Sequence, residues 1–464
     1  MFDTKWIKAY WLAIFCIISS TYALAQDLSR YVGIYQSEVD SNIYLRIEQR
    51  EDKLYMYNTQ GVMEVALSNN NTFDLVNFYA GGAFSNVRKG KFQKIIYRDW
   101  AHQVRYSRVD SVGDKNVATI SHQPFYAADL GHTNPEECQN AFPFEVTLTH
   151  NEALSSLWNE IDKGTYGRIN SVLVAKDGEL IVEKYFHGFN KDEKQMVQSV
   201  SKSITSLLAG SAIEEGYINS VDDPISQYFP KYRKSFDDGK DKISLKHALL
   251  MQAGWEWDEW AVPYTHPENA RTAQMTARDT IKYVLDLPLA NAPGTTFAYS
   301  GGAVDVVAEL IHNATPQTNA AEYFRASRLK DLCITNASWA YMQDGRMGAG
   351  GGMYFRPRDM LKFGQLIAND GEWNGKQLLS KGWIEESTQS LVYPVAQGYS
   401  YYWWNDVFVR NQKRHAAILA SGWGDQTIAV FKEHNLVIVT TGYNFERFGD
   451  NRKIIDEHIL PAFL

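Results

Sequence analysis

The sequence contains few cysteines and lacks the common metal-binding patterns. Only three cysteines occur among 464 residues, and no Cys/His cluster or His-Glu-x-x-His run accompanies them. Both absences argue against a metal site. Cys138 and Cys333 lie far apart in the chain, and the sequence fits either a disulfide in an oxidising compartment or two unpaired thiols.

An excess of basic residues is also missing. The formal net charge of -8 gives no electrostatic footprint for nucleic acid, so we expect no nucleic-acid partner. Hydrophobic residues make up 45% and charged residues 22%, which argues against both disorder and a multi-span membrane protein. At roughly 100–200 residues per domain, the length predicts two or three domains.

An apolar run lies at the N-terminus, where residues 1–25 have the composition of a signal peptide. Lys5 and Lys8 precede "YWLAIFCII", and the small residues Ala23 and Ala25 are placed for cleavage. This run has about ten residues, whereas a spanning helix needs about 20, so a retained anchor is the weaker alternative. We therefore expect a periplasmic or secreted protein without an integral membrane span after signal cleavage.

Short strand-like runs fill residues 26–111. Many alternate apolar and polar residues between Asn, Asp or Gly punctuation, which predicts a small antiparallel barrel or sandwich domain. The aromatic residues of these runs could line a ligand cavity, but alternating aromatics normally fill the core of half-buried strands. Residues 112–148 lose this periodicity and are predicted to be a connector.

Residues 149–464 combine strand and helix patterns. In "INSVLVAKDGELIVEKYF" two apolar runs meet at Asp177-Gly178, which is typical of a hairpin. Helical patterns follow, and "HAAILASGW" and "QTIAVFKEHNLVIVTTGY" near the end indicate further strands. Strands at both ends with helices between them predict an α+β domain, an antiparallel sheet with a helical region.

A Ser-x-x-Lys pattern occurs twice, at Ser199 to Lys202 and at Ser327 to Lys330. Apolar residues at helical spacing follow Lys202, so the first motif is expected to open a buried helix on which both side chains share a face. A serine hydroxyl needs a base, and burial makes a lysine a usable one by disfavouring its charged form. The second motif lies in the charged stretch "EYFRASRLKD", where a solvated lysine keeps its proton.

Two later stretches, "APGTTFAYSGGAVDVVAELI" and "ILASGWGDQTIAVF", extend the first motif into an ordered set. With them the sequence resembles the serine β-lactamase and penicillin-binding-protein superfamily, most closely its class C-like esterase and aminohexanoate-dimer hydrolase branch. The resemblance begins at about residue 150. It implies a β-lactamase/transpeptidase-like fold, preceded here by the small all-β domain, and a serine hydrolase that needs no cofactor.

Site residues follow from this resemblance by position. Ser199 matches the acylated nucleophile and Lys202 its proton-accepting partner. Tyr299 falls where the family has the Tyr of a Tyr-x-Asn element, which passes protons to the leaving group.

The family's Lys-Thr-Gly element is replaced by Trp423-Gly424-Asp425 in this alignment. The resemblance then implies an oxyanion hole formed by the backbone N–H groups of Ser199 and Gln426. Backbone donors of this kind stabilise the charge that develops on the attacked oxygen.

Two departures from the family limit the expected substrate. Gly301 stands where many relatives have Asn, and no Lys-Thr-Gly exists in the chain. The Lys of that element attracts the substrate carboxylate of β-lactams and D-Ala-D-Ala peptides, and Trp423 cannot replace it. An ester or unactivated amide without that carboxylate fits better.

We therefore expect an exported serine hydrolase acting by acyl-enzyme formation on small-molecule carboxylic esters or amides. One alternative is a β-lactamase or D-Ala-D-Ala carboxypeptidase, and another is a non-catalytic protein that binds wall fragments or peptides. The oligomeric state stays open. Residues 254–260 and 401–404 either line an acyl pocket or pack in the core, and Gly348 to Gly352 favour close backbone packing over phosphate binding.

Overall fold

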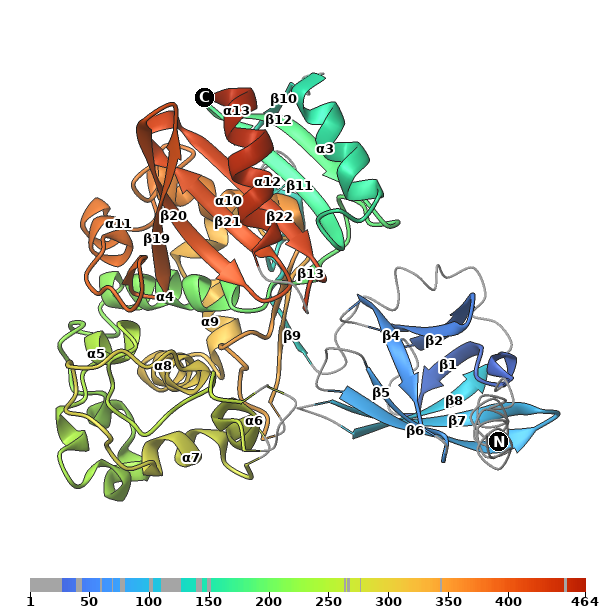
Figure 1. Cartoon of the computed structure of the whole chain (residues 1–464). Helices are drawn as coiled ribbons and strands as arrows, with labels where there is room; N and C mark the ends of the chain where they lie inside the picture. Colours follow the sequence, from blue (N-terminus) through green and yellow to red (C-terminus); the bar gives the residue numbers. More distant parts are fainter. Residues whose placement is uncertain are drawn as a thin grey trace, which may run out of the picture.

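The protein consists of an N-terminal β-barrel and a larger α+β body (Figure 1). The predicted signal peptide and much of the predicted connector lie outside the described residues. No helix within the described part of the chain is long and apolar enough to cross a membrane. The computed structural model describes residues 27–38, 44–58, 61–68, 70–75, 80–99, 103–109, 127–138, 144–147, 152–262, 264, 268–275, 277–342, 344–445 and 449–464.

The N-terminal body is a closed antiparallel barrel, which confirms the predicted all-β region. Each strand pairs with the next, and the last pairs with the first. Aromatic side chains fill the interior, as expected for a small barrel: the ring of Tyr31 lies 4.8 Å from those of both Phe84 and Phe92. The strands are β1 (Gly33–Ser37), β2 (Tyr44–Arg50), β3 (Lys53–Asn58), β4 (Gly61–Leu67), β5 (Thr72–Leu75), β6 (Ala80–Arg88), β7 (Lys91–Asp99) and β8 (Gln103–Val109).

The larger body is built on one eight-stranded sheet in the order β10-β12-β11-β22-β21-β20-β19-β18. The predicted hairpin turns at Asp177 and Gly178, whose φ angles of 52° and 85° suit a tight two-residue loop. The predicted strands near the end are also present. The strands are β10 (Glu145–Val146), β11 (Ile169–Lys176), β12 (Glu179–Tyr185), β18 (Gly398–Ser400), β19 (Trp403–Arg410), β20 (Lys413–Gly422), β21 (Gln426–Phe431) and β22 (Leu436–Gly442).

Helices bury both faces of this sheet, which explains the continuous apolar run of β11. Leu173 and Ala175 join a core with α4, α8 and α10, whereas Val172 and Val174 pack with α3 and the C-terminal helices. The α-helices are α3 (Glu152–Asp162), α4 (Val200–Glu214), α5 (Leu245–Leu249), α6 (Ala270–Met275), α7 (Thr280–Asp286), α8 (Gly301–Ala314), α9 (Ala320–Ala326), α10 (Pro357–Ala368), α11 (Lys381–Thr388), α12 (Asp450–Ile454) and α13 (Leu460–Phe463).

Shorter helical turns connect these elements. The 3₁₀ turns are η1 (Leu28–Arg30), η2 (Pro135–Cys138), η3 (Ile225–Tyr228), η4 (Pro230–Phe236), η5 (Lys240–Lys242), η6 (Arg328–Leu332) and η7 (Lys432–His434). The π-helix η8 (Ile455–Ile459) joins α12 to α13.

A second, four-stranded sheet links the connector to the start of α4. Its order is β13-β15-β14-β9, with β13 (Gln195–Met196), β15 (Met353–Phe355), β14 (Ser338–Ala340) and β9 (Ala127–Asp129). Both β9 and β10 come from the predicted connector, so that segment is partly a component of the two sheets. A separate hairpin pairs β16 (Glu372–Trp373) with β17 (Lys376–Gln377).

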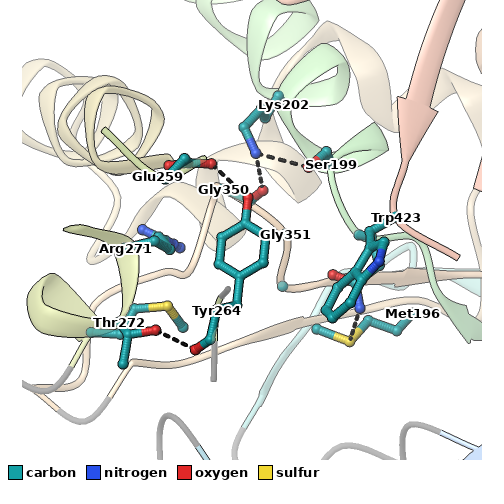
Figure 2. A pocket seen from close by; sticks show the side chains of 13 residues that line it. Met196, Ser199, Lys202, Glu259, Tyr264, Arg271, Thr272, Gly350, Gly351 and Trp423 are labelled. Atoms are coloured by element: carbon teal, nitrogen blue, oxygen red, sulfur yellow. Dashed lines mark hydrogen bonds between the residues drawn. The ribbon is translucent and has the colours of Figure 1, made fainter. Parts of the chain in front are cut away.

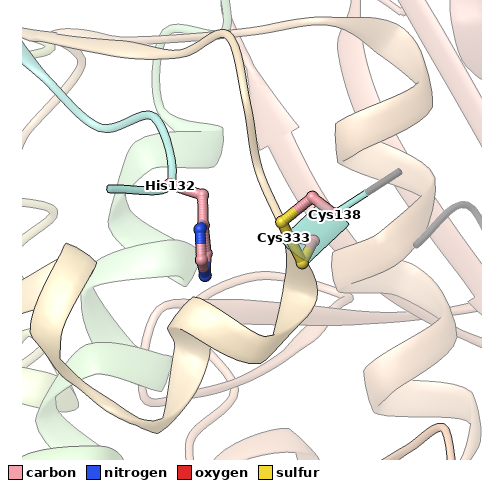
Figure 3. A group of neighbouring side chains, drawn as sticks. All are labelled: His132, Cys138 and Cys333. Atoms are coloured by element: carbon pink, nitrogen blue, oxygen red, sulfur yellow. A yellow bond between two sulfur atoms is a disulfide. The ribbon is translucent and has the colours of Figure 1, made fainter. Parts of the chain in front are cut away.

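A disulfide joins the connector to the larger body (Figure 3). Cys138 and Cys333 are bonded, which resolves the choice that the sequence left open. His132 lies beside the bond, with a ring nitrogen within 4.8 Å of the sulfur atoms. Because the two sulfurs are bonded to each other, these three side chains are not a set of metal ligands in this structure.

Candidate active site

Ser199 and Lys202 meet at the N-terminus of α4. Lys202 Nζ lies 3.0 Å from Ser199 Oγ, and both side chains face the same cavity (Figure 2). Ser199 is the N-cap residue of α4, but its hydroxyl caps no backbone N–H and so remains available to Lys202. Gln198, which precedes it, has a φ of 50°. This left-handed conformation is unusual for a residue other than glycine, and it lies in the turn between β13 and α4.

The amine of Lys202 is almost completely removed from solvent, with 3% of the residue exposed. Burial is the largest cause that lowers its pKa, to about 8; Glu259 and Asp305 oppose the shift and Arg271 adds to it. The carbonyl of Gly350 also accepts a hydrogen bond from Nζ. A substantial fraction of Lys202 is therefore neutral near pH 8 and able to accept a proton.

Tyr299 comes from a distant part of the chain to complete the group. It lies directly before Ser300, which caps α8 by accepting a hydrogen bond of 3.0 Å from Ala303 N–H. The Tyr299 ring lies 4.8 Å from Lys202 Nζ. Burial raises the pKa of Tyr299 above its usual value, while its hydrogen bond with Ser199 partly opposes this, so the phenol keeps its proton at neutral pH.

Arg271 fills the space beside Gly301. A Cβ atom on Gly301 would lie 2.9 Å from Arg271 Nε, and one on Gly350 would lie 3.0 Å from Arg271 Cζ and 3.1 Å from the Gly301 Cα. Arg271 is buried and is paired with Asp305, so it cannot easily move away. The glycines at 301 and 350 are thus required by close packing, as the sequence suggested for the glycine run.

Glu259 is a site residue that the sequence reasoning missed. It is 3% exposed, and it accepts hydrogen bonds from Gly301 N–H at 2.7 Å, Trp257 Nε1 at 3.0 Å and the Tyr264 hydroxyl at 3.0 Å. Together with Arg271 and Asp305 it surrounds Lys202 with buried charge. A sequence signal existed only for Arg271: its partner Asp305 stands alone in the apolar run "GGAVDVVAELI", and a buried charge needs a partner.

The hairpin between β20 and β21 faces the nucleophile. Gln426, which was expected to contribute a backbone N–H to the oxyanion hole, does not lie at the part of the hairpin beside Ser199. Its loop is Trp423-Gly424-Asp425, and Gly422 already pairs with Gln426. The Gln426 side chain is buried and donates to the carbonyls of Gly424 and Gly442. In the described part of the chain, Trp423 borders the cavities beside Ser199 and Gln426 does not.

Two cavities meet at Ser199. The smaller, of about 90 Å³, lies against Lys202, Arg271 and Gly350. The larger, of about 380 Å³, lies against Tyr299 and extends between β19, β20 and α12.

The two aromatic stretches divide between this site and the core. Trp260 and Trp404 border the larger cavity. Trp255, Trp257 and Trp403 are buried in the core. Each stretch therefore contributes one tryptophan to the lining of a cavity and others to the core.

Comparisons with known proteins identify the family of the larger body. The family model described as Beta-lactamase matches residues 170–456. The 6-aminohexanoate-dimer hydrolase of Paenarthrobacter ureafaciens is 28% identical over 229 residues, which cover 47% of this chain and 56% of that protein. Protein flp of Staphylococcus aureus is 24% identical over 36% of this chain and 34% of its own length. The chain thus spans about half or less of these curated relatives.

Solved structures share the fold of the larger body. A Bacillus anthracis protein provisionally described as a 6-aminohexanoate-dimer hydrolase has a TM-score of 0.58 and 22% identity, covering 72% of this chain and 89% of that one. EstCE1, described as a hydrolase with promiscuous acyltransferase activity, has a TM-score of 0.53 and 16% identity, covering 67% of this chain and 98% of its own. The family match spans more than half of the chain, and the chain therefore belongs to the β-lactamase family of serine hydrolases.

Proposed function

We propose that this protein is an exported serine hydrolase that cleaves small-molecule carboxylic esters or amides through an acyl-enzyme. The observation that carries the proposal is the buried amine of Lys202 lying 3.0 Å from the Ser199 hydroxyl, with the phenol of Tyr299 beside both. A nucleophile, a base and a proton carrier in mutual contact are what acyl transfer requires.

The proposed reaction has two halves. Neutral Lys202 takes the proton of Ser199 while the serine oxygen bonds to the substrate carbonyl carbon. The bond from that carbon to the leaving oxygen or nitrogen then breaks, and a proton passes through Tyr299 to the departing atom. Water finally attacks the acyl-serine, which releases the carboxylic acid and restores the serine hydroxyl.

Backbone N–H groups of Ser199 and Trp423 are the proposed oxyanion donors, in place of Ser199 and Gln426. Gly422 packs tightly against the turn before Ser199, since a Cβ on it would lie 2.4 Å from the Val197 carbonyl oxygen. This close approach brings the following residue, Trp423, beside the nucleophile. In serine hydrolases one such donor contributes about 10²–10³ in rate.

The charges around the cavities favour substrates without a recognition carboxylate. The hairpin loop Trp423-Gly424-Asp425 carries no cation in place of the missing lysine. Arg452, a cation beside the larger cavity, is already paired with Asp406 at 2.8 Å. Neutral esters or amides therefore remain the proposed substrates, ahead of β-lactams and D-Ala-D-Ala peptides.

Export to the periplasm or the medium is part of the proposal. It is supported by the signal-like composition of residues 1–25 and by the disulfide between Cys138 and Cys333. Disulfides persist mainly in oxidising compartments.

Labelling with a fluorophosphonate probe tests the function. Wild type, Ser199→Ala and the matched control Ser327→Ala are incubated with the probe, with short-chain p-nitrophenyl esters and with nitrocefin, and intact mass locates the adduct. We expect wild type and Ser327→Ala to be labelled and to hydrolyse the esters, whereas Ser199→Ala does neither.

Other results of this experiment point elsewhere. Equal labelling of Ser199→Ala would remove Ser199 as the nucleophile. Strong nitrocefin hydrolysis would favour a β-lactamase, and absence of both labelling and turnover in the wild type would favour the non-catalytic binding protein.

A further inference from the structure

The two cavities at the nucleophile differ fourfold in volume, at about 90 and 380 Å³. Ser199, Tyr264 and Trp423 border both of them, so the nucleophile lies at their junction. A carbonyl carbon bonded to Ser199 at this point directs its acyl group into one cavity and its leaving group into the other. The volumes therefore limit the two halves of a substrate separately.

The position of Tyr299 decides which half enters which cavity. Among the described lining residues, Tyr299 borders the larger cavity and Lys202 borders the smaller one. A group that protonates the departing atom must lie within hydrogen-bond reach of that atom. The leaving group therefore occupies the larger cavity, and the acyl group occupies the smaller one.

The smaller cavity fits a short acyl group. A protein cavity of about 150 Å³ holds one benzene molecule, so about 90 Å³ accommodates a chain of a few carbon atoms. One wall of this cavity is fixed by an ion pair. The buried Arg271 is held by its pairing with Asp305, and Met275, also on the lining, is 7% exposed.

The larger cavity offers flat aromatic surfaces. Trp260 stacks on Tyr299 at 5.1 Å and 19°, and Tyr299 stacks on Trp404 at 6.2 Å and 26°. Trp260 remains 59% exposed, which leaves part of this stack open to a further ring. Offset stacking of aromatic rings is favourable beyond simple burial of apolar area.

The far end of the larger cavity is polar, and its charged lining residues already have partners: Asp425 accepts a hydrogen bond of 2.6 Å from Asn444 Nδ2. Asp406 accepts a hydrogen bond of 2.8 Å from Gln397 and pairs with Arg452 at 2.8 Å. A charged substrate group would have to compete with this pair, whereas a neutral polar group would not.

We propose that the substrates are esters or amides of a short acyl group with a large, uncharged aromatic alcohol or amine. This inference rests on the proposed function, because it assigns the two cavities by the roles of Ser199 and Tyr299.

Two isomeric esters test the assignment. In 2-naphthylmethyl acetate the ring is on the alcohol side, and in methyl 2-naphthylacetate it is on the acyl side; both are unactivated alkyl esters of equal size. We expect kcat/KM for the first to exceed that for the second by at least about tenfold, within the range that a shaped apolar pocket provides. Equal values, or a preference for the second ester, would overturn the inference.

Hydrolysis of p-nitrophenyl acetate separates the two kinds of failure. If wild type hydrolyses it and Ser199→Ala does not, the proposed function stands, and the isomer ratio alone decides the substrate class. If wild type hydrolyses none of the three esters and takes up no fluorophosphonate, the proposed function fails and this inference fails with it.

Variants in each cavity sharpen the test. Met275→Ala enlarges the smaller cavity and is expected to raise kcat/KM for methyl 2-naphthylacetate more than for its isomer. Trp260→Ala is expected to lower kcat/KM for 2-naphthylmethyl acetate more than for its isomer. Tyr393→Ala, at a residue that is 70% exposed and outside the described linings, is the control. Equal effects of Trp260→Ala on both esters would contradict the placement of the leaving group.

Discussion

The chain contains the same four-residue pattern twice, and the two copies have opposite surroundings. Ser199 leaves its hydroxyl uncapped, and Lys202 is 3% exposed and hydrogen-bonded to it. Ser327 uses its hydroxyl to cap η6, accepting from Leu329 N–H and donating to the Phe324 carbonyl. Lys330 points into solvent. The spacing is identical, so burial and hydrogen bonding distinguish a reactive pair from a structural one.

A second side-chain contact between a lysine and a serine adds a further condition. Lys194 donates to Ser338, and burial lowers the pKa of Lys194 to about 8, as it does for Lys202. Both residues are buried, and neither is among the described residues that line the two cavities. A lowered pKa is therefore insufficient without a space in which the substrate can reach the serine.

The largest expected effect separates the two lysines of the repeated pattern. Lys202→Arg keeps the charge but cannot act as a base, because arginine stays protonated in proteins. We expect kcat/KM for p-nitrophenyl acetate to fall at least about 10²–10⁴-fold, the usual contribution of a general base. Lys330→Arg, the matched control, should change it less than twofold by the same rough scale. Similar losses in both variants would contradict the assignment of Lys202 as the base.

The next largest effect on the rate is expected at Tyr299, whose phenol has no counterpart near Ser327 and Lys330 in the residues described above. Tyr299→Phe removes the proton carrier but keeps the aromatic stack with Trp260 and Trp404. We expect a loss of about 10²-fold for an alkyl ester and a smaller loss for a p-nitrophenyl ester, since nitrophenolate leaves without a proton. Steady-state kinetics on both esters measure this difference. Equal losses would assign Tyr299 a structural role.

A smaller effect is a shift in pH dependence. The active form of Lys202 is the neutral amine, so kcat/KM should decrease by about tenfold per pH unit as the pH falls below the lysine pKa of about 8. Glu259 raises that pKa, so Glu259→Gln should move the acidic limb of the profile to lower pH.

The pH profile of kcat/KM for a neutral ester measures this shift. Glu385→Gln, at an exposed position, serves as the control. A limb that moves to higher pH in Glu259→Gln would contradict the proposed electrostatics.

The smallest expected effect on the rate comes from the region of the second motif. Cys333 follows η6 and is joined to Cys138 across 195 residues. Cys333→Ser should lower the free energy of unfolding by about 2–5 kcal/mol. Because neither cysteine is among the described residues that line the two cavities, kcat/KM should stay within about twofold of wild type at temperatures where the variant is folded. Thermal denaturation and ester kinetics test both statements, and a large loss of rate in folded protein would link the connector to catalysis.

Elements with strong local patterns were predictable. The hairpin of β11 and β12 was marked by Asp177-Gly178, and the three C-terminal strands by their long apolar runs. Gln426 was misplaced because the loop of the β20–β21 hairpin has only three residues, so Gln426 already lies within β21. The loop length follows from the strand register, in which Gly422 pairs with Gln426. A single sequence does not reveal that register.

The packing of the Arg271 side chain against Gly301 could not be predicted, for another reason. The two residues lie 30 positions apart, and the guanidinium occupies the space that a side chain at 301 would need. Glu259 was hidden in the same way, because its partner Gly301 N–H comes from α8, 42 residues along the chain. That one residue fills the space left by a distant glycine can be recognised only from the three-dimensional structure.

The amino-acid sequence by itself determined the all-β region, the α+β layout and the candidate nucleophile, because periodicity and motif order are local properties of the chain. The tertiary structure decided which of two equal motifs has a buried amine, how Arg271 and Glu259 surround it, and how two unequal cavities meet at Ser199. Burial and cavity volume arise from contacts between remote segments, and no short stretch of sequence contains them.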